Sequence, residues 1–139
     1  PREFLHAIRL YRENFRPSEH LKKPYVMACV NVVAAPTDAE AEFLSSSMKL
    51  MFRGIVTGMR RPLQPPVDNI DEIWTEMERE AVYQMLSVSF IGGPQRIREG
   101  IRSFREQTAV DEVIVSSTIY DHQARLRSYR LFAEILKGS

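Results

Sequence analysis

Three groups of residues in this sequence carry side chains that could bind or act on a ligand. Tyr120 and His122 lie just past the carboxyl end of a buried strand expected over residues 112–118. Polar residues at the carboxyl ends of parallel strands are candidate site residues. Arg60 and Arg61 lie in a proline-rich stretch and could clamp a phosphate or another anion. Asn31 interrupts an apolar run, where a buried amide needs a hydrogen-bond partner.

Each candidate also has a structural interpretation, and the residues alone leave both open. Asp121 is a suitable N-cap, which would leave His122 exposed in the first turn of a helix. Arginines in loops are usually solvated, and Asn31 could be satisfied within the fold. The sequence Gly92-Gly93-Pro94 could suggest phosphate binding at a helix start, but Pro94 removes one N–H donor. We expect a structural helix break there.

Composition limits the function classes. The 139 residues include 19 Lys and Arg against 18 Asp and Glu, a net charge of +1, which gives no reason to expect nucleic acid or a membrane surface as partner. The single cysteine, Cys29, excludes a disulfide framework and a multi-cysteine metal centre, and we expect no metal site. With no apolar run of ~18 residues, the sequence predicts a cytoplasmic protein.

Two segments are typical of buried strands. Residues 25–35 are apolar on both alternating faces, with Asn31 as the exception, and residues 112–118 have a continuous apolar centre. A strand that is apolar on both faces is usually covered on both, as in parallel sheets. We therefore expect Cys29 to be an inert core residue and the two segments to be adjacent parallel strands of a larger α/β sheet or barrel.

Helical patterns surround these strands. Residues 1–16 form an amphipathic pattern, capping-box sequences begin at Thr37 and Thr75, and a further helix begins at Pro94. The last helix is expected over 121–137, with Gly138 as its C-terminal cap. The proline-rich stretch after Gly58 predicts an irregular loop. The predicted order is α-β-α-loop-α-α-β-α, a helix-rich α/β chain.

Several stretches resemble one family. They are Tyr11-Arg-Glu-Asn-Phe-Arg-Pro-Ser18, Pro24-Tyr-Val-Met, Val30-Asn-Val-Val-Ala-Ala35, Pro65-Pro-Val-Asp-Asn69, Ser89-Phe-Ile-Gly-Gly-Pro94 and Ile119-Tyr-Asp-His-Gln-Ala-Arg-Leu-Arg-Ser128. Together, in this order and spacing, they resemble the C-terminal part of the bacterial-luciferase-like flavin monooxygenases, also called luciferase family oxidoreductases. The resemblance covers essentially the whole chain.

This resemblance implies a fold and an activity. The fold would be the C-terminal portion of a (β/α)8 TIM barrel. Residues 1–139 would form one unit, with 25–35 and 112–118 as the last two barrel strands and a lid-like insertion at about 58–74. The whole enzyme would use reduced FMN, supplied by a flavin reductase, and dioxygen to oxidise a small organic substrate. Six strands lie outside the chain, so we expect it to be inactive alone and to hold no FMN tightly.

Within this interpretation the pocket candidates are Asn31, Arg60, Arg61, Tyr120 and His122, and no catalytic residue is assigned. The alternative is a free-standing, non-enzymatic α/β domain that associates with itself through exposed strand edges. Both interpretations predict a homo-oligomer. The sequence does not separate them.

Overall fold

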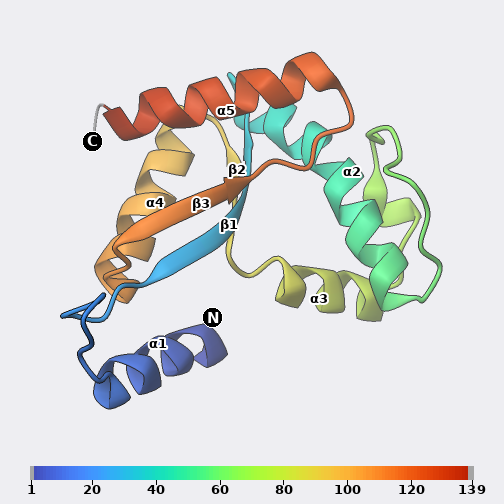
Figure 1. Ribbon diagram of the computed structural model, residues 1–139. Helices are drawn as coiled ribbons and strands as arrows, with labels where there is room; N and C mark the ends of the chain where they lie inside the picture. The colour runs from blue at the N-terminus through green and yellow to red at the C-terminus, as the bar shows by residue number, and fades with distance from the viewer. Residues whose placement is uncertain (1, 138–139) are drawn as a thin grey trace.

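The computed structural model describes residues 2–137. Helices surround a small sheet (Figure 1), and the helix-rich α/β class that the sequence predicts is confirmed. The elements in chain order are α1 (Arg2–Asn14), β1 (Met27–Ala34), α2 (Asp38–Val56), the 3-10 turn η1 (Ile70–Glu72), α3 (Glu76–Met85), β2 (Ser89–Gly92), α4 (Pro94–Thr108), β3 (Glu112–Ser116) and α5 (His122–Lys137).

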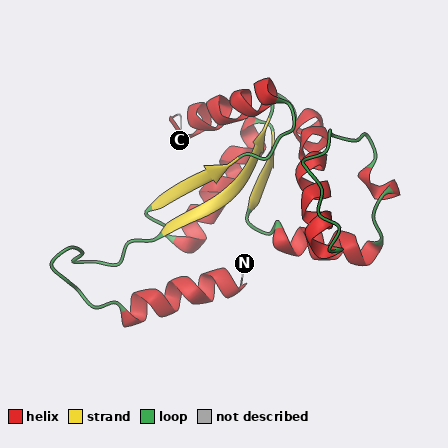
Figure 2. Ribbon diagram, turned by 45° about the vertical axis from the view of Figure 1, so that its right-hand side comes forward, coloured by secondary structure: helices red, strands yellow, loops and turns green. Residues whose placement is uncertain are grey.

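The sheet is parallel, with the strand order β2-β1-β3 (Figure 2). The five positions Met27–Asn31 of β1 pair with Glu112–Ser116 of β3, so the predicted adjacent parallel strands are confirmed. The predicted number of strands is wrong, because β2 pairs with Asn31–Ala34 on the other edge of β1. The helix predicted before Gly92 ends at Met85, and the next turn leads into this short strand.

One face of the sheet is covered by α4 and α5. Every second residue of β1 (Ala28, Val30, Val32 and Ala34) is at most 1% exposed and packs against side chains of these helices. The helices contribute the buried residues Ile97, Ile101, Phe132 and Ile135. Alternate residues of a strand share one face, and residues three or four apart share one face of a helix. The apolar faces of β1 and of the two helices therefore pack against each other.

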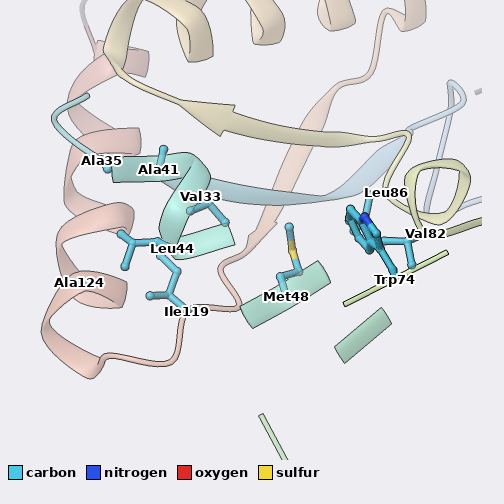
Figure 3. Close-up of a cluster of buried hydrophobic side chains, with 10 residues drawn as sticks. All are labelled: Val33, Ala35, Ala41, Leu44, Met48, Trp74, Val82, Leu86, Ile119 and Ala124. Carbon is cyan, nitrogen blue, oxygen red and sulfur yellow. The ribbon is translucent and has the colours of Figure 1, made fainter. Parts of the chain in front are cut away.

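A second core lies beyond the carboxyl end of β1, where α2 and α3 meet (Figure 3). Figure 3 shows Met48 of α2 between Val33 of β1 and Trp74, which precedes α3. The other members are Ala35, Ala41, Leu44, Val82, Leu86, Ile119 and Ala124. In Figures 1 and 2, α2, α3 and their connection lie on the side toward which the strand arrows point.

Local capping explains where the helices begin. Thr75 and Glu78 form a complete capping box. At α2 only half of the predicted box forms: the Thr37 hydroxyl accepts from the Glu40 N–H, while the Glu40 carboxylate pairs with Arg127. Pro94 occupies the first turn of α4, as predicted.

The C-terminus of α4 is capped from a distance. The helix is followed by its C-cap residue, Ala109, which has a left-handed backbone with φ of 48°. Arg12 of α1 donates to the carbonyl of Thr108, at 2.9 Å, and to that of Ala109. A cation is favourable at this end of a helix, so Arg12 fastens α1 to α4 together with the Phe4–Phe104 ring pair.

Two further expectations meet different outcomes. The second face of β1 is not covered along its whole length, because Met27 is 52% exposed and Cys29 is exposed, so the interpretation of Cys29 as a core residue is wrong. The expected cap Gly138 lies outside the described residues. None of the helices between residues 2 and 137 is long and apolar enough to cross a membrane.

Candidate functional site

Part of one sheet face is left uncovered over Met27–Asn31 of β1 and Glu112–Ser116 of β3, and we call this part the open face. Residues paired in register on parallel strands point to the same side, so Met27 stands beside Glu112, Cys29 beside Ile114, and Asn31 beside Ser116. Ile114 is 45% exposed. The open face is therefore apolar in its middle row, where Cys29 and Ile114 lie, and polar in the row toward the carboxyl ends.

This polar row extends over all three strands. Asn31 of β1 pairs in register with both Ser89 of β2 and Ser116 of β3. Its Nδ2 donates to the Ser89 hydroxyl at 3.3 Å. An amide has two N–H donors and a carbonyl, so Asn31 keeps further hydrogen-bonding groups for a ligand. Asn31 is thus partly buried and hydrogen-bonded within the fold. A contact between Asn31 and a ligand stays a prediction.

Buried hydroxyl groups fix the carboxyl ends of β1 and β3. The Ser128 hydroxyl of α5 accepts from the backbone N–H of Ala34 at 2.9 Å and lies 3.1 Å from the Ser117 hydroxyl. The Tyr129 hydroxyl accepts from the Ser117 N–H at 3.0 Å. These contacts hold both strand ends against α5. These contacts could not be predicted from the sequence, in which they appear only as small polar residues within apolar stretches.

Tyr120 and His122 lie just past these strand ends. Asp121 between them accepts from the Ala124 N–H at 2.7 Å, so it caps α5 as the structural interpretation predicts. His122 is exposed in the first turn, with its Nδ1 2.9 Å from the Arg125 guanidinium. Tyr120 is 51% exposed. Both side chains are accessible, and their participation in a site stays a prediction.

Arg60 and Arg61 lie at the other end of α2. This helix has 19 residues, which is about 28 Å at 1.5 Å per residue. Ile119 and Ala124, which lie on either side of Tyr120 and His122 in the sequence, pack with Ala41 and Leu44 in the first half of this helix, whereas the arginines follow its last turn. The structure therefore does not bring the loop arginines together with Tyr120 and His122. Both arginines are exposed, and Arg61 lines a cavity of about 380 Å³ between α2 and the proline-rich loop.

The segment after α2 is anchored at three points. The Val67 N–H donates to the Ser46 hydroxyl at 2.8 Å, and the buried Trp74 donates to Asp71 at 2.8 Å. Arg53 of α2 binds both carboxylate oxygens of Glu78, at 3.0 and 3.3 Å. The Arg53 guanidinium, with a second contribution from the Thr75 backbone N–H, holds the pKa of Glu78 below its ordinary value.

A buried lysine was not predicted from the sequence. Lys49 of α2 is 1% exposed; its ammonium pairs with Glu42 and lies 5.6 Å from the centre of the Tyr83 ring. It borders a cavity of about 620 Å³ that Ser89 and Arg96 also line. A lysine on a helix is normally exposed, so its burial follows from the packing of α3 on α2.

The start of α4 is closed to anions by the chain itself. The Asp38 carboxylate accepts from the Gly93 N–H at 2.6 Å. A carboxylate of the chain therefore already uses the N–H of the N-cap residue at this helix start. This agrees with the structural interpretation of Gly92-Gly93-Pro94.

Comparison with known proteins supplies the family context. No protein-family model matches the chain. A protein named luciferase-like monooxygenase from Escherichia coli K12 is 41% identical over 135 residues, which is 97% of this chain and 40% of that protein. The chain is homologous to part of the luciferase-like monooxygenases.

Other relatives agree with this. The uncharacterized protein YvbT of Bacillus subtilis is 35% identical over 138 residues, covering 99% of this chain and 41% of YvbT. The crystal structure of apo-MsnO8 superposes with a TM-score of 0.74 at 29% identity, covering 98% of this chain and 42% of that one. The chain thus spans about two fifths of the length of each of these relatives. These comparisons confirm the predicted resemblance as homology to luciferase-like proteins. The cofactor and the substrate stay predictions.

Proposed function

We propose that the chain is the C-terminal portion of a (β/α)8 barrel enzyme of the luciferase-like group, an FMN-dependent monooxygenase or oxidoreductase acting on an organic substrate with dioxygen. Homology to the E. coli luciferase-like monooxygenase supports the class of reaction. The adjacent parallel strands β1 and β3, with α4 and α5 on one side only, support the barrel. Residues 1–139 form a single unit of it.

The open face is the observation that carries this proposal. Burying apolar surface stabilises a fold by about 25 cal/mol for each Å² removed from water. Met27 and Ile114 are about half exposed, so this stabilisation is missing on the open face. In a closed barrel this face points inward, while α4 and α5 form part of the outer ring. The remaining strands of the barrel would cover the open face.

The carboxyl-end row of the open face fits the polar edge of a planar aromatic cofactor. Asn31 and its neighbours Ser89 and Ser116 offer hydrogen bonds there, whereas Cys29 and Ile114 in the middle row would be covered by the other strands. Reduced FMN, when bound, would supply the electrons for the reaction with dioxygen, and a flavin reductase would supply it. Asn31 and its two serine neighbours would orient the ligand, with Tyr120 and His122 at the rim.

The segment 58–74 would act as a cover over the site. It lies on the carboxyl side of the strands (Figure 1), where the active sites of barrels are found. Ser46 of α2 binds this segment, and Arg53 of α2 binds α3, which follows it. The cover would therefore not move independently of α2. Arg60 and Arg61 would hold the phosphate of the flavin or an anionic substrate and help to exclude water.

A chimera tests this proposal. The chain replaces the 135 residues that it matches in the E. coli relative, and FMN binding is measured by fluorescence quenching for the chimera, the unchanged relative and the chain alone. We expect the chimera to bind FMN within about tenfold of the relative, a difference of at most about 1.4 kcal/mol. The isolated chain should bind no FMN tightly. A folded chimera without FMN affinity, beside a relative that binds it, would contradict the proposal.

A second candidate is a non-enzymatic domain that associates through strand edges. It is favoured by the two edge strands β2 and β3, whose outer sides have no partner among the described residues. A chimera that fails to fold, while the chain alone forms a stable oligomer insensitive to salt, would favour this candidate.

A further inference from the structure

The charges of this nearly neutral chain are separated into two surfaces. From Asp68 to Glu80 the sequence contains six acidic residues and one arginine, and we call this segment the acidic surface. The helices α4 and α5 together contain eight Lys and Arg against three Glu. In Figure 1, α3 lies on one side of the sheet and α4 on the other.

The acidic surface also exposes apolar side chains. Met77 of α3 is 81% exposed, and Ile73 just after η1 is 38% exposed. Glu76 and Glu80, both exposed, flank Met77 on the same helix. A protruding methionine beside carboxylates is adaptable contact surface, because its unbranched side chain fits many shapes.

A groove on the other side of the molecule has the opposite charge. It has a volume of about 670 Å³ and lies between α4 and the end of α5. Its apolar lining includes Ile101, Val110 and Leu136, and its charged lining consists of three arginines and one glutamate: Arg98, Arg102, Arg105 and Glu106. We call it the basic groove. Among residues 2–137, Arg102 is the one arginine of this lining with an ion-pair partner, Glu106 at 4.0 Å, and both side chains are about 70% exposed.

We propose that the acidic surface of one copy of this chain docks into the basic groove of a second copy. The spacing is complementary: Glu76 and Glu80 are four residues apart on α3, as Arg98 and Arg102 are on α4, and such pairs lie about 6 Å apart on a helix surface. Met77 would contact the apolar lining between the arginines. Because the two surfaces lie on opposite sides of the sheet, the contact is head-to-tail between copies.

The distribution of the arginines favours a protein surface over a small anion. Arg98 and Arg105 are seven residues apart on α4, which places them about 10 Å apart along the axis. A single carboxylate or phosphate contacts one or two of them, whereas a helix with several carboxylates contacts all three. Both walls of the groove belong to this chain, so the proposal does not depend on the proposed enzyme function.

Charge reversal tests this interface in the full 139-residue chain. Self-association is measured by sedimentation velocity for the wild-type chain, for Arg98→Glu with Arg105→Glu, and for Glu76→Lys with Glu80→Lys. Each reversed variant should associate at least tenfold more weakly, because like charges then face each other. An equimolar mixture of the two variants should restore the wild-type affinity within about threefold, since each surface again meets its opposite. Raising NaCl from roughly 50 to 500 mM should weaken the wild-type contact.

Two matched controls carry the same charge changes elsewhere. Lys22→Glu with Lys23→Glu, and Glu3→Lys with Glu19→Lys, change exposed residues outside both surfaces and should leave association unchanged. Far-UV circular dichroism confirms that each variant is folded. A monomeric wild-type chain at low salt would overturn the proposal. The proposal would also be overturned if neither charge reversal weakened self-association, or if the mixture of the two variants did not restore the wild-type affinity. Either result would indicate contacts through the open face or the strand edges.

Discussion

The guanidinium of Arg53 donates hydrogen bonds to both carboxylate oxygens of Glu78. This contact joins the end of α2 to the first turn of α3. Glu78 also closes the capping box with Thr75. One carboxylate therefore serves a helix start and a contact between helices. Its protonation state affects both.

Glu78→Gln should destabilise the chain at neutral pH and have less effect in acid. The pKa of Glu78 is lowered by Arg53, so its contribution to stability is present above the ordinary pKa of a glutamate and is lost as the pH falls through the lower, folded-state pKa. Urea midpoints at pH 7 and at acidic pH measure this. Glu80→Gln on the same helix is the control, and a loss for Glu78→Gln that does not diminish in acid would contradict the prediction.

The buried ion pair of Lys49 predicts an asymmetry between its partners. Lys49→Met keeps most of the packing and removes the need to bury a charge, so we expect a change within about 1 kcal/mol. Glu42→Gln leaves the ammonium buried beside Tyr83 without its counter-ion and should cost about 1–2 kcal/mol, since half-exposed Glu42 is partly screened.

The double variant Glu42→Gln with Lys49→Met should be about as stable as Lys49→Met alone. Chemical denaturation of all four proteins gives the coupling energy of the pair. Strictly additive losses would show that the pair does not act as a unit.

Ala109→Gly should stabilise the chain by about 0.5–1 kcal/mol. Ala109 has φ of 48° at the end of α4, a conformation that costs about 1 kcal/mol for a residue with a Cβ and little for glycine. Thermal unfolding measures the difference. Ala133→Gly, on the exposed side of α5, should lower stability by about 1 kcal/mol instead, and equal effects of the two changes would be inconsistent with this account.

In the chimera with the E. coli relative, Arg60→Ala with Arg61→Ala should weaken binding of FMN or of an anionic substrate by about tenfold. This is the loss expected for one charge-assisted hydrogen bond. Lys22→Ala with Lys23→Ala provides a control for net charge. Unchanged affinity in the arginine variant would contradict the proposed role of the segment 58–74 at the ligand site. Both arginines would then be solvated surface residues.

The predictions that succeeded depend on local sequence. The cap at Thr75, the proline at the start of α4 and the apolar cores of β1 and β3 are fixed by neighbours along the chain. Strand β2 was missed because its four residues follow a helical pattern without a break, and it exists only through pairing with β1. Tertiary pairing of this kind has no local signal.

The errors and omissions at the site have the same origin. Asp38 meets Gly93 across 55 positions of the chain, and Lys49 is buried by a helix that follows a long loop. Cys29 has the residue type and the alternation of a core position, yet nothing among residues 2–137 covers it. Alternation shows which residues share a face, but it does not show whether a partner layer belongs to the same chain.

The contact between Asp38 and Gly93 has a consequence for ligand selectivity. A negatively charged group that approached the first turn of α4 would be repelled by a carboxylate already in place. The backbone N–H of Gly93 is therefore occupied and does not favour a phosphorylated flavin over riboflavin. Any such preference would have to come from cationic side chains, and comparing the affinities for FMN and riboflavin would show how much they contribute.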